Sequence, residues 1–349
     1  MSTKIEWATD VWNPITGCPG PKVSPGCAHC YAERMATTRL RGRMGYDASD
    51  PFKVTYHHDR YEMFLRARTH KRIFVNSMGD LFHPDVDQHE LDCVFAAMLA
   101  NEITTGPSHD YMILTKRPDI MAEYFAPGPD VLLRRWGKAG NGWIHVGDGD
   151  EYFSEYAEAH TVPQSDHERY PNLLHKHLWP LPNVWLMATV CNQDEADRLI
   201  PILLEISAAV RGVSIEPMLG PVDLTRYLDM EETRYRGDDT SGFLDYEPLL
   251  HWVICGGETG PGARPMHPDW VRGLRDQCAA AGTPFFFKRW GELVTENQSP
   301  DEIILPGQSS IPHGWKGRKY EDSVYRVGKR RSGRLLDGVE WNELPGVSC

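Results

Sequence analysis

Residues 184–217, VWLMATVCNQDEADRLIPILLEISAAVRGVSIEP, decide the fold. An apolar run at 184–189 is followed by a stretch with helical periodicity at 195–210 and by a second apolar run at 212–215. Short apolar runs that alternate with longer helical stretches are typical of βαβ units. The segment therefore predicts two parallel strands joined by a helix, with a right-handed crossover.

The same alternation extends along the chain in both directions. Further strands are predicted at 10–15, 72–76, 111–114, 251–254 and 284–287. Further helices are predicted at 28–41, 87–101 and 268–281. We therefore expect an α/β fold with a parallel sheet, a partial TIM-like barrel of about six to eight strands.

Two long intervals interrupt this alternation, near 136–182 and 225–248, and they are predicted to be acidic loop insertions. The barrel with its insertions is expected to occupy residues 1–294. Residues 295–349 are rich in Gly and Pro and are predicted to form a mostly irregular C-terminal extension that packs on the barrel.

The composition favours a cytoplasmic globular protein. With 41% hydrophobic and 25% charged residues, the 349-residue chain has ordinary globular proportions and is long enough for a barrel with insertions. No apolar run approaches the roughly 18 residues of a membrane span, and MSTKIEWATDVWNP at the start contains no apolar signal core. Eight unevenly spaced cysteines in a chain of this size argue against a disulfide framework.

The net charge of −12 is unevenly distributed. Lys and Arg outnumber Asp and Glu ten to five over 31–72 and eight to two over 313–334, while much of the acid lies in 147–168 and 229–247. The basic stretches could contact the phosphates of a nucleic acid at the barrel mouth. The side chains expected to do so are Arg66, Arg68, Lys329, Arg330 and Arg331. Solvated surface charge, or pairing with the acidic segments, explains these stretches equally well.

Reactive side chains follow each predicted strand, at the end where parallel β/α proteins build their sites. In chain order they are Cys18, Cys27 and Cys30; Asp80, His83 and Asp85; Lys116 and Arg117; Cys191 and Asn192; Glu216; Glu258; and Lys288, Arg289 and Trp290. A polar residue often follows a strand, but seven such ends in succession indicate a common site. Its cations could hold a carboxylate or phosphate, and ion pairing with the nearby glutamates is an equal alternative.

The most specific motif is the cysteine loop at 17–30, GCPGPKVSPGCAHC. Thiolates spaced as Cys27 and Cys30 can bind one metal centre, and Cys18 can complete the set from the Gly- and Pro-rich loop. Three thiolates leave one coordination position open, which in an iron–sulfur cluster is an iron that accepts an exchangeable ligand. The main alternative is structural zinc, which needs a fourth ligand. The candidates for that ligand are His29, His57 and His58.

Long segments of the sequence resemble a known family. They are WNPITGC, KVSPGCAHCYAE, SMGDLFH, LTKRP, VSIEPMLGP, GGETGPGARPMHPDWVR, PFFFKRWG and GRLLDGVEWNELP. On these segments the chain is similar to the three-Cys-motif phage-type proteins, which belong with or near the radical S-adenosylmethionine (SAM) superfamily. The resemblance covers nearly the whole chain apart from the acidic insertions.

The resemblance implies a [4Fe–4S] cluster held by Cys18, Cys27 and Cys30, with SAM bound to the open iron through its amino and carboxylate groups. Reductive cleavage of SAM would then yield a 5′-deoxyadenosyl radical that abstracts hydrogen from the substrate. The usual superfamily signature is C-x3-C-x2-C, whereas the first gap here is eight residues long. His29 stands where the superfamily usually has an aromatic residue, and Tyr31 follows the last cysteine as usual.

The resemblance also suggests roles for single residues. The superfamily motif that contacts the SAM amino group maps onto Met78-Gly79-Asp80, and Gly256-Gly257-Glu258 matches the same motif in letters after the sixth strand. The expected cofactor-binding residues are Ser77, Gly79, Asp80, Lys116, Asn192, Gly256, Gly257 and Glu258. The expected catalytic residues are Cys191, Glu216 and Lys288. Packing is the alternative for Cys191, and Cys93 is predicted to be a core residue.

The leading hypothesis is a radical SAM enzyme of isomerase or lyase type that modifies, rearranges or repairs a nucleic-acid base, in chemistry related to DNA hypermodification. Its partners would be DNA or a nucleotide and an external electron donor of the flavodoxin or ferredoxin type, and no membrane. One alternative is a non-catalytic zinc-binding module of a phage or defence system. The other is a radical SAM enzyme that acts on a small molecule or peptide.

Overall fold

The computed structural model describes most of the chain, namely residues 3, 5–104, 108–145, 153–155, 157, 178–228, 230–233, 245–295, 298, 309–314 and 321–346. Most of the acidic segment 147–168 and more than half of 229–247 therefore lie outside the described residues. The same holds for 315–320, which contribute to the second basic stretch.

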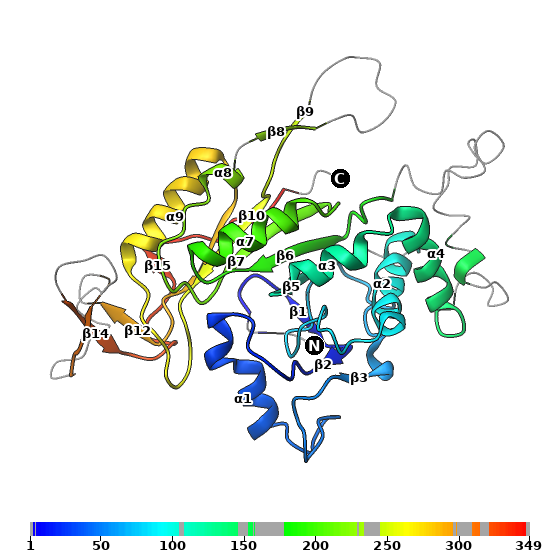
Figure 1. Ribbon diagram of the computed structural model, residues 1–349, viewed down its shortest axis with the longest axis horizontal. Helices are drawn as coiled ribbons and strands as arrows, with labels where there is room; N and C mark the ends of the chain where they lie inside the picture. Colours follow the sequence, from blue (N-terminus) through cyan, green and yellow to red (C-terminus); the bar gives the residue numbers. More distant parts are fainter. Residues whose placement is uncertain are drawn as a thin grey trace.

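Seven parallel strands form a curled, open half-barrel (Figure 1). They are β1 (Asp10–Trp12), β4 (Arg72–Val75), β5 (Asp110–Thr115), β6 (Val184–Thr189), β7 (Val210–Ile215), β10 (Trp252–Gly256) and β11 (Phe285–Arg289). Their order across the sheet is their order along the chain, and every adjacent pair is parallel. The predicted partial β/α barrel of six to eight strands is confirmed.

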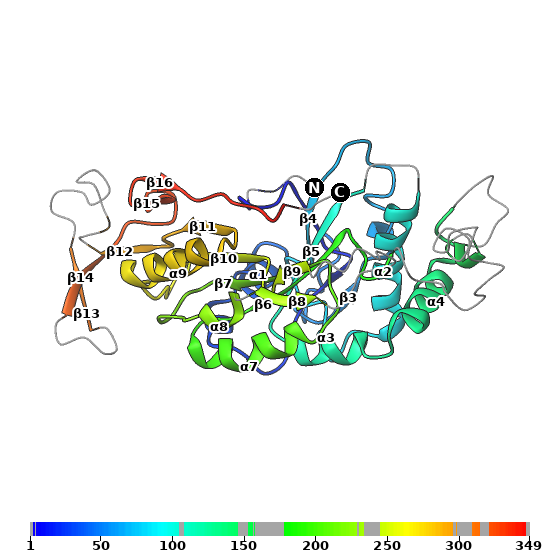
Figure 2. The same ribbon diagram turned by 90° about the horizontal axis from the view of Figure 1, so that it is seen from above.

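Helices pack along one face of this sheet (Figure 2). They are α2 (Gln88–Ile103), α3 (Pro118–Phe125), α7 (Gln193–Leu204) and α9 (Pro268–Ala281), with the shorter α8 (Thr225–Leu228) beside α9. A further helix, α4 (Pro129–Gly140), packs against α2. α9 has the predicted bounds. The prediction of a helix over 195–210 was too long, because Val210 already pairs with Trp185 in the sheet and needs an extended backbone.

The short α8 was not predicted, and neither were the longer helices α3 and α4. The two longer helices each begin with a Pro-Asp pair, Pro118-Asp119 and Pro129-Asp130. Proline fits the first helical position because its missing N–H has no helical partner there, and the aspartate stabilises the positive end of the helix dipole. These start signals were present in the sequence. α4 also occupies the first residues of the interval that was predicted to be a loop insertion.

Alternate strand residues pack on opposite faces of the sheet, as the two-residue repeat of a strand requires. In β11, Phe285 and Phe287 join the large core beneath the helices, whereas Phe286 packs on the other face with Trp185 and Trp252. We call this second surface the inner face. Near the chain ends, Trp7 and Leu344 pack on it too. The inner face therefore points away from the helices and toward the interior of the half-barrel.

The first predicted strand, 10–15, is two strands in the structure. β1 ends at Trp12, and β2 (Ile15–Thr16) pairs antiparallel with β3 (Thr55–Tyr56) in a separate sheet. Pro14 lies between them and has no N–H to donate to a sheet. The second predicted insertion also contains strands, because β8 (Met230–Thr233) and β9 (Asp245–Pro248) pair antiparallel.

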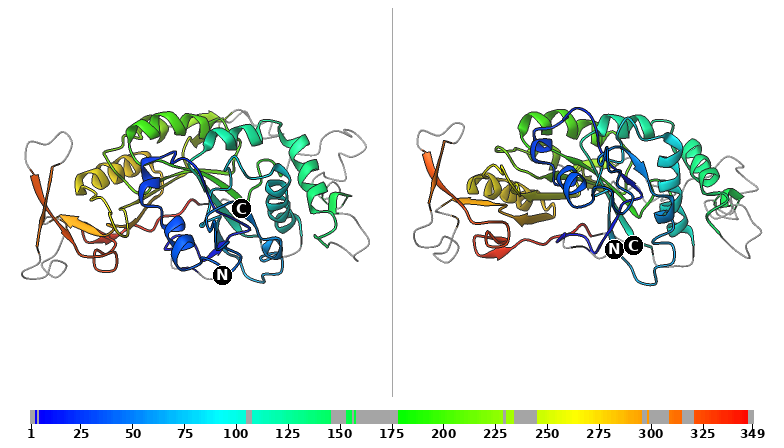
Figure 3. Two further views of the ribbon diagram at one scale, coloured as in Figure 1. Left: turned by 60° about the horizontal axis from the view of Figure 1, so that its bottom comes forward. Right: turned by 90° about the horizontal axis from the view of Figure 1, so that it is seen from below.

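The chain after β11 is more regular than predicted. β12 (Leu293–Thr295), β13 (Ile311–Gly314) and β14 (Glu321–Arg326) form an antiparallel sheet at the opposite end of the molecule from α4 (Figure 3). β15 (Leu335–Leu336) and β16 (Val339–Glu340) pair next, and the Phe287 N–H donates to the Trp341 carbonyl at 3.0 Å. This last segment thus packs on the edge of the half-barrel.

No helix in the described ranges is both long enough and apolar enough to cross a membrane.

Candidate functional site

The cysteine loop lies at the carboxyl end of the sheet. The Gly17 N–H donates to the Met78 carbonyl at 3.0 Å, and Gly17 also pairs with Gly79, so the loop is joined to the segment that follows β4. Cys18, Cys27 and Cys30 carry free thiols and are all partly exposed. The three cysteines thus lie where parallel β/α proteins place their reactive groups.

The loop is also shaped locally. Cys27 lies in a short 3₁₀ helix, Pro25–His29, which Ser24 caps by accepting a hydrogen bond from the Gly26 N–H at 3.1 Å. Cys30 is the residue that precedes α1 (Tyr31–Thr38). A capped 3₁₀ turn followed at once by a helix fixes the backbone on both sides of the C-x2-C pair.

Residues from other strand ends hold the loop from outside. The Nε2–H of His83, after β4, donates to the Pro19 carbonyl at 2.9 Å, and Nδ1 of the same ring accepts from the Asp85 N–H at 3.1 Å. Nη2 of Arg264, after β10, donates to the Pro25 carbonyl at 3.0 Å. His83 was singled out from the sequence, but Arg264 was missed because no spacing relates it to the cysteines.

Arg117 connects the loop to the end of β5. Its Nη1 lies 3.4 Å from Cys18 Sγ and 3.0 Å from Asp80 Oδ2. Both the arginine and the aspartate are buried. Burial raises the pKa of the Cys18 thiol, and the Arg117 guanidinium opposes that shift by favouring the thiolate.

The Asp80 carboxylate has four donors from the protein. Oδ1 accepts from the Thr115 hydroxyl at 2.7 Å and from the Phe82 N–H at 3.1 Å, while Oδ2 accepts from the Lys116 N–H at 3.2 Å and from Arg117. A carboxylate offers about four acceptor positions. The expected direct contact between Asp80 and the SAM amino group therefore has little room, and the geometry gives Asp80 the role of holding Arg117.

Lys116 continues the alternation of Met112 and Leu114, which pack on the inner face. Its side chain is partly buried. Within the described part of the chain, no carboxylate forms an ion pair with it. Arg117, Arg264 and Lys288 each have an acidic partner in the same region. Lys116 is thus a cation at a strand end that an anionic ligand can approach.

Glu216 and Lys288 meet across β10. Nζ of Lys288 lies 2.7 Å from Oε1 and 2.9 Å from Oε2 of Glu216. The strand between them carries Gly256, where a Cβ would lie 3.3 Å from Lys288 Cβ and 3.4 Å from Glu216 Cδ. The missing side chain at Gly256 therefore leaves the space in which this ion pair forms.

Two predicted residues have local explanations that need no ligand. The Gly257 N–H donates to the Arg289 carbonyl at 2.9 Å, and its backbone passes too close to that of Trp290 for any side chain. Asn192 caps α7 by accepting from the Glu195 N–H at 2.9 Å.

Ser77 presents its carbonyl to the Tyr31 hydroxyl, next to the cysteine loop. Arg289, which was grouped with Lys288, pairs with Glu6 instead.

Glu258 joins the Gly-Gly-Glu segment to the cysteine loop. It receives Arg264 Nη2 at 2.6 Å and Nε at 2.8 Å, and its Oε1 lies 3.1 Å from His29 Nδ1. Burial alone would raise the pKa of Glu258, but Arg264 and His29 outweigh it and hold the pKa below its ordinary value. Glu258 is therefore an anion with protein partners, beside the loop rather than on the inner face.

Cys191 lies beneath the cysteine loop, with its Sγ 3.6 Å from Ser24 Oγ. It is fully buried, and burial raises its pKa to about 12. Burial therefore favours the protonated thiol of Cys191 over the thiolate that a nucleophile requires. Cys93 and Cys255 are buried in the main core, and for Cys93 this confirms the prediction.

The candidate ligands for a single metal ion are dispersed. Within the described ranges, no group of three His, Cys, Asp or Glu side chains converges on one ion position. His57 Nε2 contacts the Thr16 hydroxyl at 2.8 Å, His58 Nε2 contacts Glu90 at 3.0 Å, and His29 faces Glu258. Each histidine proposed as a fourth zinc ligand thus has another partner.

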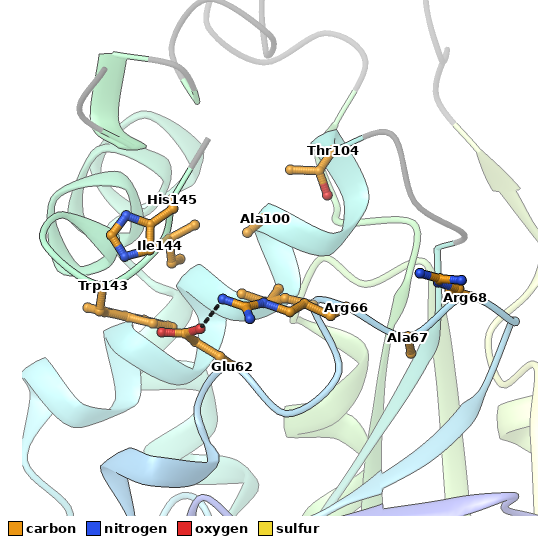
Figure 4. Close-up of a pocket in the computed structure, with 10 residues that line it drawn as sticks. Glu62, Arg66, Ala67, Arg68, Ala100, Thr104, Trp143, Ile144 and His145 are labelled. Carbon is orange, nitrogen blue, oxygen red and sulfur yellow. Dashed lines mark ion pairs between the residues drawn. The ribbon is translucent and has the colours of Figure 1, made fainter. Parts of the chain in front are cut away.

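A cavity of about 500 Å³ opens at the other end of the sheet (Figure 4). Arg66 and Arg68 line it, and Arg66 is turned toward Glu62, its ion-pair partner at 3.6 Å. The preceding Phe64 carbonyl accepts from His109 Nε2 at 3.2 Å, just before β5 begins. Both arginines therefore lie at the amino ends of the strands, and the expectation that they lie at the barrel mouth was wrong.

The chain matches, over residues 2–345, the family described as "Protein of unknown function (DUF5131)". No curated protein and no solved structure matches it.

Proposed function

This chain belongs to the DUF5131 family of proteins of unknown function, and we propose that it is a radical SAM enzyme whose [4Fe–4S] cluster is held by Cys18, Cys27 and Cys30. One observation carries the proposal. Three free, partly exposed thiols lie on a single loop at the carboxyl end of a parallel half-barrel.

The donor set suits a cluster with one open iron. Iron–sulfur clusters take cysteine thiolates as ligands, and each thiolate binds a different iron, so the three sulfurs need not converge on one ion position. The Arg117 guanidinium beside Cys18 adds a positive charge where a cluster would add negative charge. When bound, the cluster supplies the electron that cleaves SAM reductively and generates the 5′-deoxyadenosyl radical.

The neighbouring residues would bind and orient SAM and substrate. Lys116 is a cation available for a carboxylate or phosphate, because Arg117, Arg264 and Lys288 in the same region each have an acidic partner. The Glu216–Lys288 pair lies on the inner face and would border the substrate. The Cys191 thiol is buried beneath the loop, and burial raises its pKa, which favours the S–H form over the thiolate.

The substrate class that we propose is a nucleic-acid base or nucleotide, modified or rearranged in an isomerase- or lyase-type reaction. Support comes from the exposed cations Lys329, Arg330 and Arg331, which lie just beyond the carboxyl end of β11. The Ser332 hydroxyl holds their turn there by donating to the Gly291 carbonyl at 2.7 Å. An external donor of the flavodoxin or ferredoxin type would deliver the electron.

Metal analysis of protein purified without oxygen tests this function. We expect about four irons and four sulfides per chain, with a charge-transfer absorption that dithionite bleaches. Reduced protein should then cleave SAM slowly to methionine and 5′-deoxyadenosine. Stoichiometric zinc without iron would contradict the proposal and favour a non-catalytic zinc module.

A further inference from the structure

We propose that Arg117 is a positioning residue that sets the reduction potential of the cluster through Cys18 Sγ, and that Asp80 fixes it in that position. This inference rests on the function proposed above, and it names a device of that same site. It concerns how easily the cluster accepts an electron, a property that no sequence motif of this chain specifies.

The geometry leaves Arg117 little freedom. Nη1 lies 3.4 Å from Cys18 Sγ and 3.0 Å from Asp80 Oδ2, so one nitrogen faces both groups. Asp80 is fixed in turn by the Thr115 hydroxyl at 2.7 Å and by two backbone N–H groups. Arg117 is 6% exposed and Asp80 is 7% exposed. A buried guanidinium with a fixed partner stays in place when the sulfur gains or loses negative charge.

The physical effect of this contact has a definite sign. Reduction adds an electron to the cluster and so makes its sulfurs more negative. A hydrogen-bond donor and a positive charge at a ligand sulfur stabilise the reduced form more than the oxidised form, and both raise the potential. Burial removes the water that would otherwise screen the charge. Asp80 offsets part of the charge, but its carboxylate faces Arg117, whereas the donor faces the sulfur.

The competing explanation is a purely structural ion pair. The chain contains a matched pair of that kind, Arg135 and Asp92, between α4 and α2, with Nη2–Oδ1 and Nε–Oδ2 distances of 2.6 and 3.0 Å. No cysteine sulfur among the described residues accepts a hydrogen bond from Arg135. Removing it disturbs a partly buried arginine–aspartate pair without touching the cluster loop, which makes Arg135→Met the control.

The experiment is an anaerobic redox titration of the full-length protein with reconstituted cluster, followed by electron paramagnetic resonance in the absence of SAM. In Arg117→Met we expect the one-electron reduction equilibrium to shift about tenfold toward the oxidised cluster, which is a midpoint lower by 59 mV. Arg117→Lys keeps the charge and should shift less. Arg135→Met should keep the wild-type midpoint. An unchanged midpoint in Arg117→Met with a full cluster overturns the inference.

A second measurement needs no loss-of-charge variant. Wild-type protein labelled with ¹⁵N-arginine should show a nitrogen hyperfine coupling on its reduced cluster, and the coupling should vanish in labelled Arg117→Lys. Its absence in the wild type also overturns the inference. If the wild type itself assembles no cluster, the proposed function fails. That result differs from a cluster that assembles but has the same reduction potential with and without Arg117, which would overturn only this inference.

Discussion

The Lys288 ammonium lies between both carboxylate oxygens of Glu216, at 2.7 and 2.9 Å, on the inner face of the half-barrel. The two residues come from strands that are not neighbours, and they meet only because the intervening strand carries a glycine at this level. Both side chains keep about a fifth of their surface exposed. The pair is therefore accessible to a ligand at the mouth, and it is also a structural link between strands.

The two roles of this pair can be separated. Glu216→Gln and Lys288→Met should each lower the unfolding free energy by about 1.5–3 kcal/mol, because each leaves a half-buried charge without its partner. The double variant should be more stable than the sum of the singles predicts. Urea unfolding of the four proteins measures this coupling. Additive effects would show that the two side chains do not interact in solution.

The cysteine assignment predicts a sharp contrast between variants. Replacing Cys18, Cys27 and Cys30 together by Ala should abolish the iron-dependent absorption of anaerobically purified protein. Cys93→Ala should retain it, because Cys93 lies in α2 among core residues. Iron and sulfide analysis of both proteins checks this. Normal iron content in the triple variant would mean that the cluster is bound elsewhere.

Buried thiols predict a loss of stability in alkali. Burial raises the pKa of Cys93 and of Cys278 to about 12, from 9.0 in the unfolded chain. Because the folded pKa is the higher one, this contribution is complete below pH 9 and is lost as pH rises from 9 toward 12. At pH 10 each thiol should cost about 1 kcal/mol of unfolding free energy.

Urea unfolding at pH 8 and pH 10 measures that loss. Cys93→Ala should reduce the difference between the two pH values by about 1 kcal/mol, and the same holds for Cys278→Ala. A pH dependence that is identical in wild type and both variants would show that these thiols ionise as easily in the folded protein as in the unfolded one.

Much of the fold could be predicted because the signals are local. The six-residue run at 184–189 and the helix at 268–281 have the predicted bounds, since apolar periodicity and Pro and Gly boundaries specify them within one segment. The division at Pro14 and the sheet after β11 were not predicted. There, pairing with partners distant in the sequence decides the structure.

For the candidate site, too, the sequence predicted the location of the residues but not their partners. The common location of the strand ends follows from parallel topology, so the sequence could place the cysteines, Lys116 and Glu216 on one face. It could not assign partners. That Asp80 is occupied by four protein donors, and that Arg264 reaches Pro25, depends on the fit of loops far apart in the chain. For the cations after β5 and in β11, the sequence left ligand binding and ion pairing equally open. Arg117, Lys288 and Arg289 have acidic partners, whereas Lys116 forms no ion pair with the part of the chain that the structure describes.

Lys116→Met should weaken SAM binding about tenfold or more while leaving iron content unchanged, because it removes a charged donor without altering the loop. Equilibrium binding under anaerobic conditions measures this. Lys22→Met is the control, since Lys22 is exposed on the cysteine loop and pairs with Glu33. Wild-type SAM affinity in Lys116→Met would show that this cation serves the substrate or no ligand. Asp80→Asn, by contrast, should act first on the reduction potential.

The two groups of basic side chains lie at opposite ends of the sheet, so we expect only one of them to contact a nucleic acid bound at the barrel mouth. Arg66 and Arg68 lie at the amino ends of the strands, whereas Lys329, Arg330 and Arg331 are exposed beside the carboxyl end of β11. If DNA or RNA binds at the mouth, only the second group lies near its phosphates. Charge reversal at 329–331 should therefore weaken binding and flatten the plot of log affinity against log salt by about 3 units, because each lost phosphate contact removes about 0.9.

Charge reversal at Arg66 and Arg68 is the matched control and should leave that slope unchanged. Filter binding between roughly 50 and 200 mM salt, with single-stranded and double-stranded probes, measures both variants. Equal loss in the two variants would show that the nucleic acid contacts both ends of the sheet and is not confined to the barrel mouth. Absence of binding at about 50 mM salt would favour a radical enzyme that acts on a small molecule or peptide, because phosphate contacts are strongest at low salt.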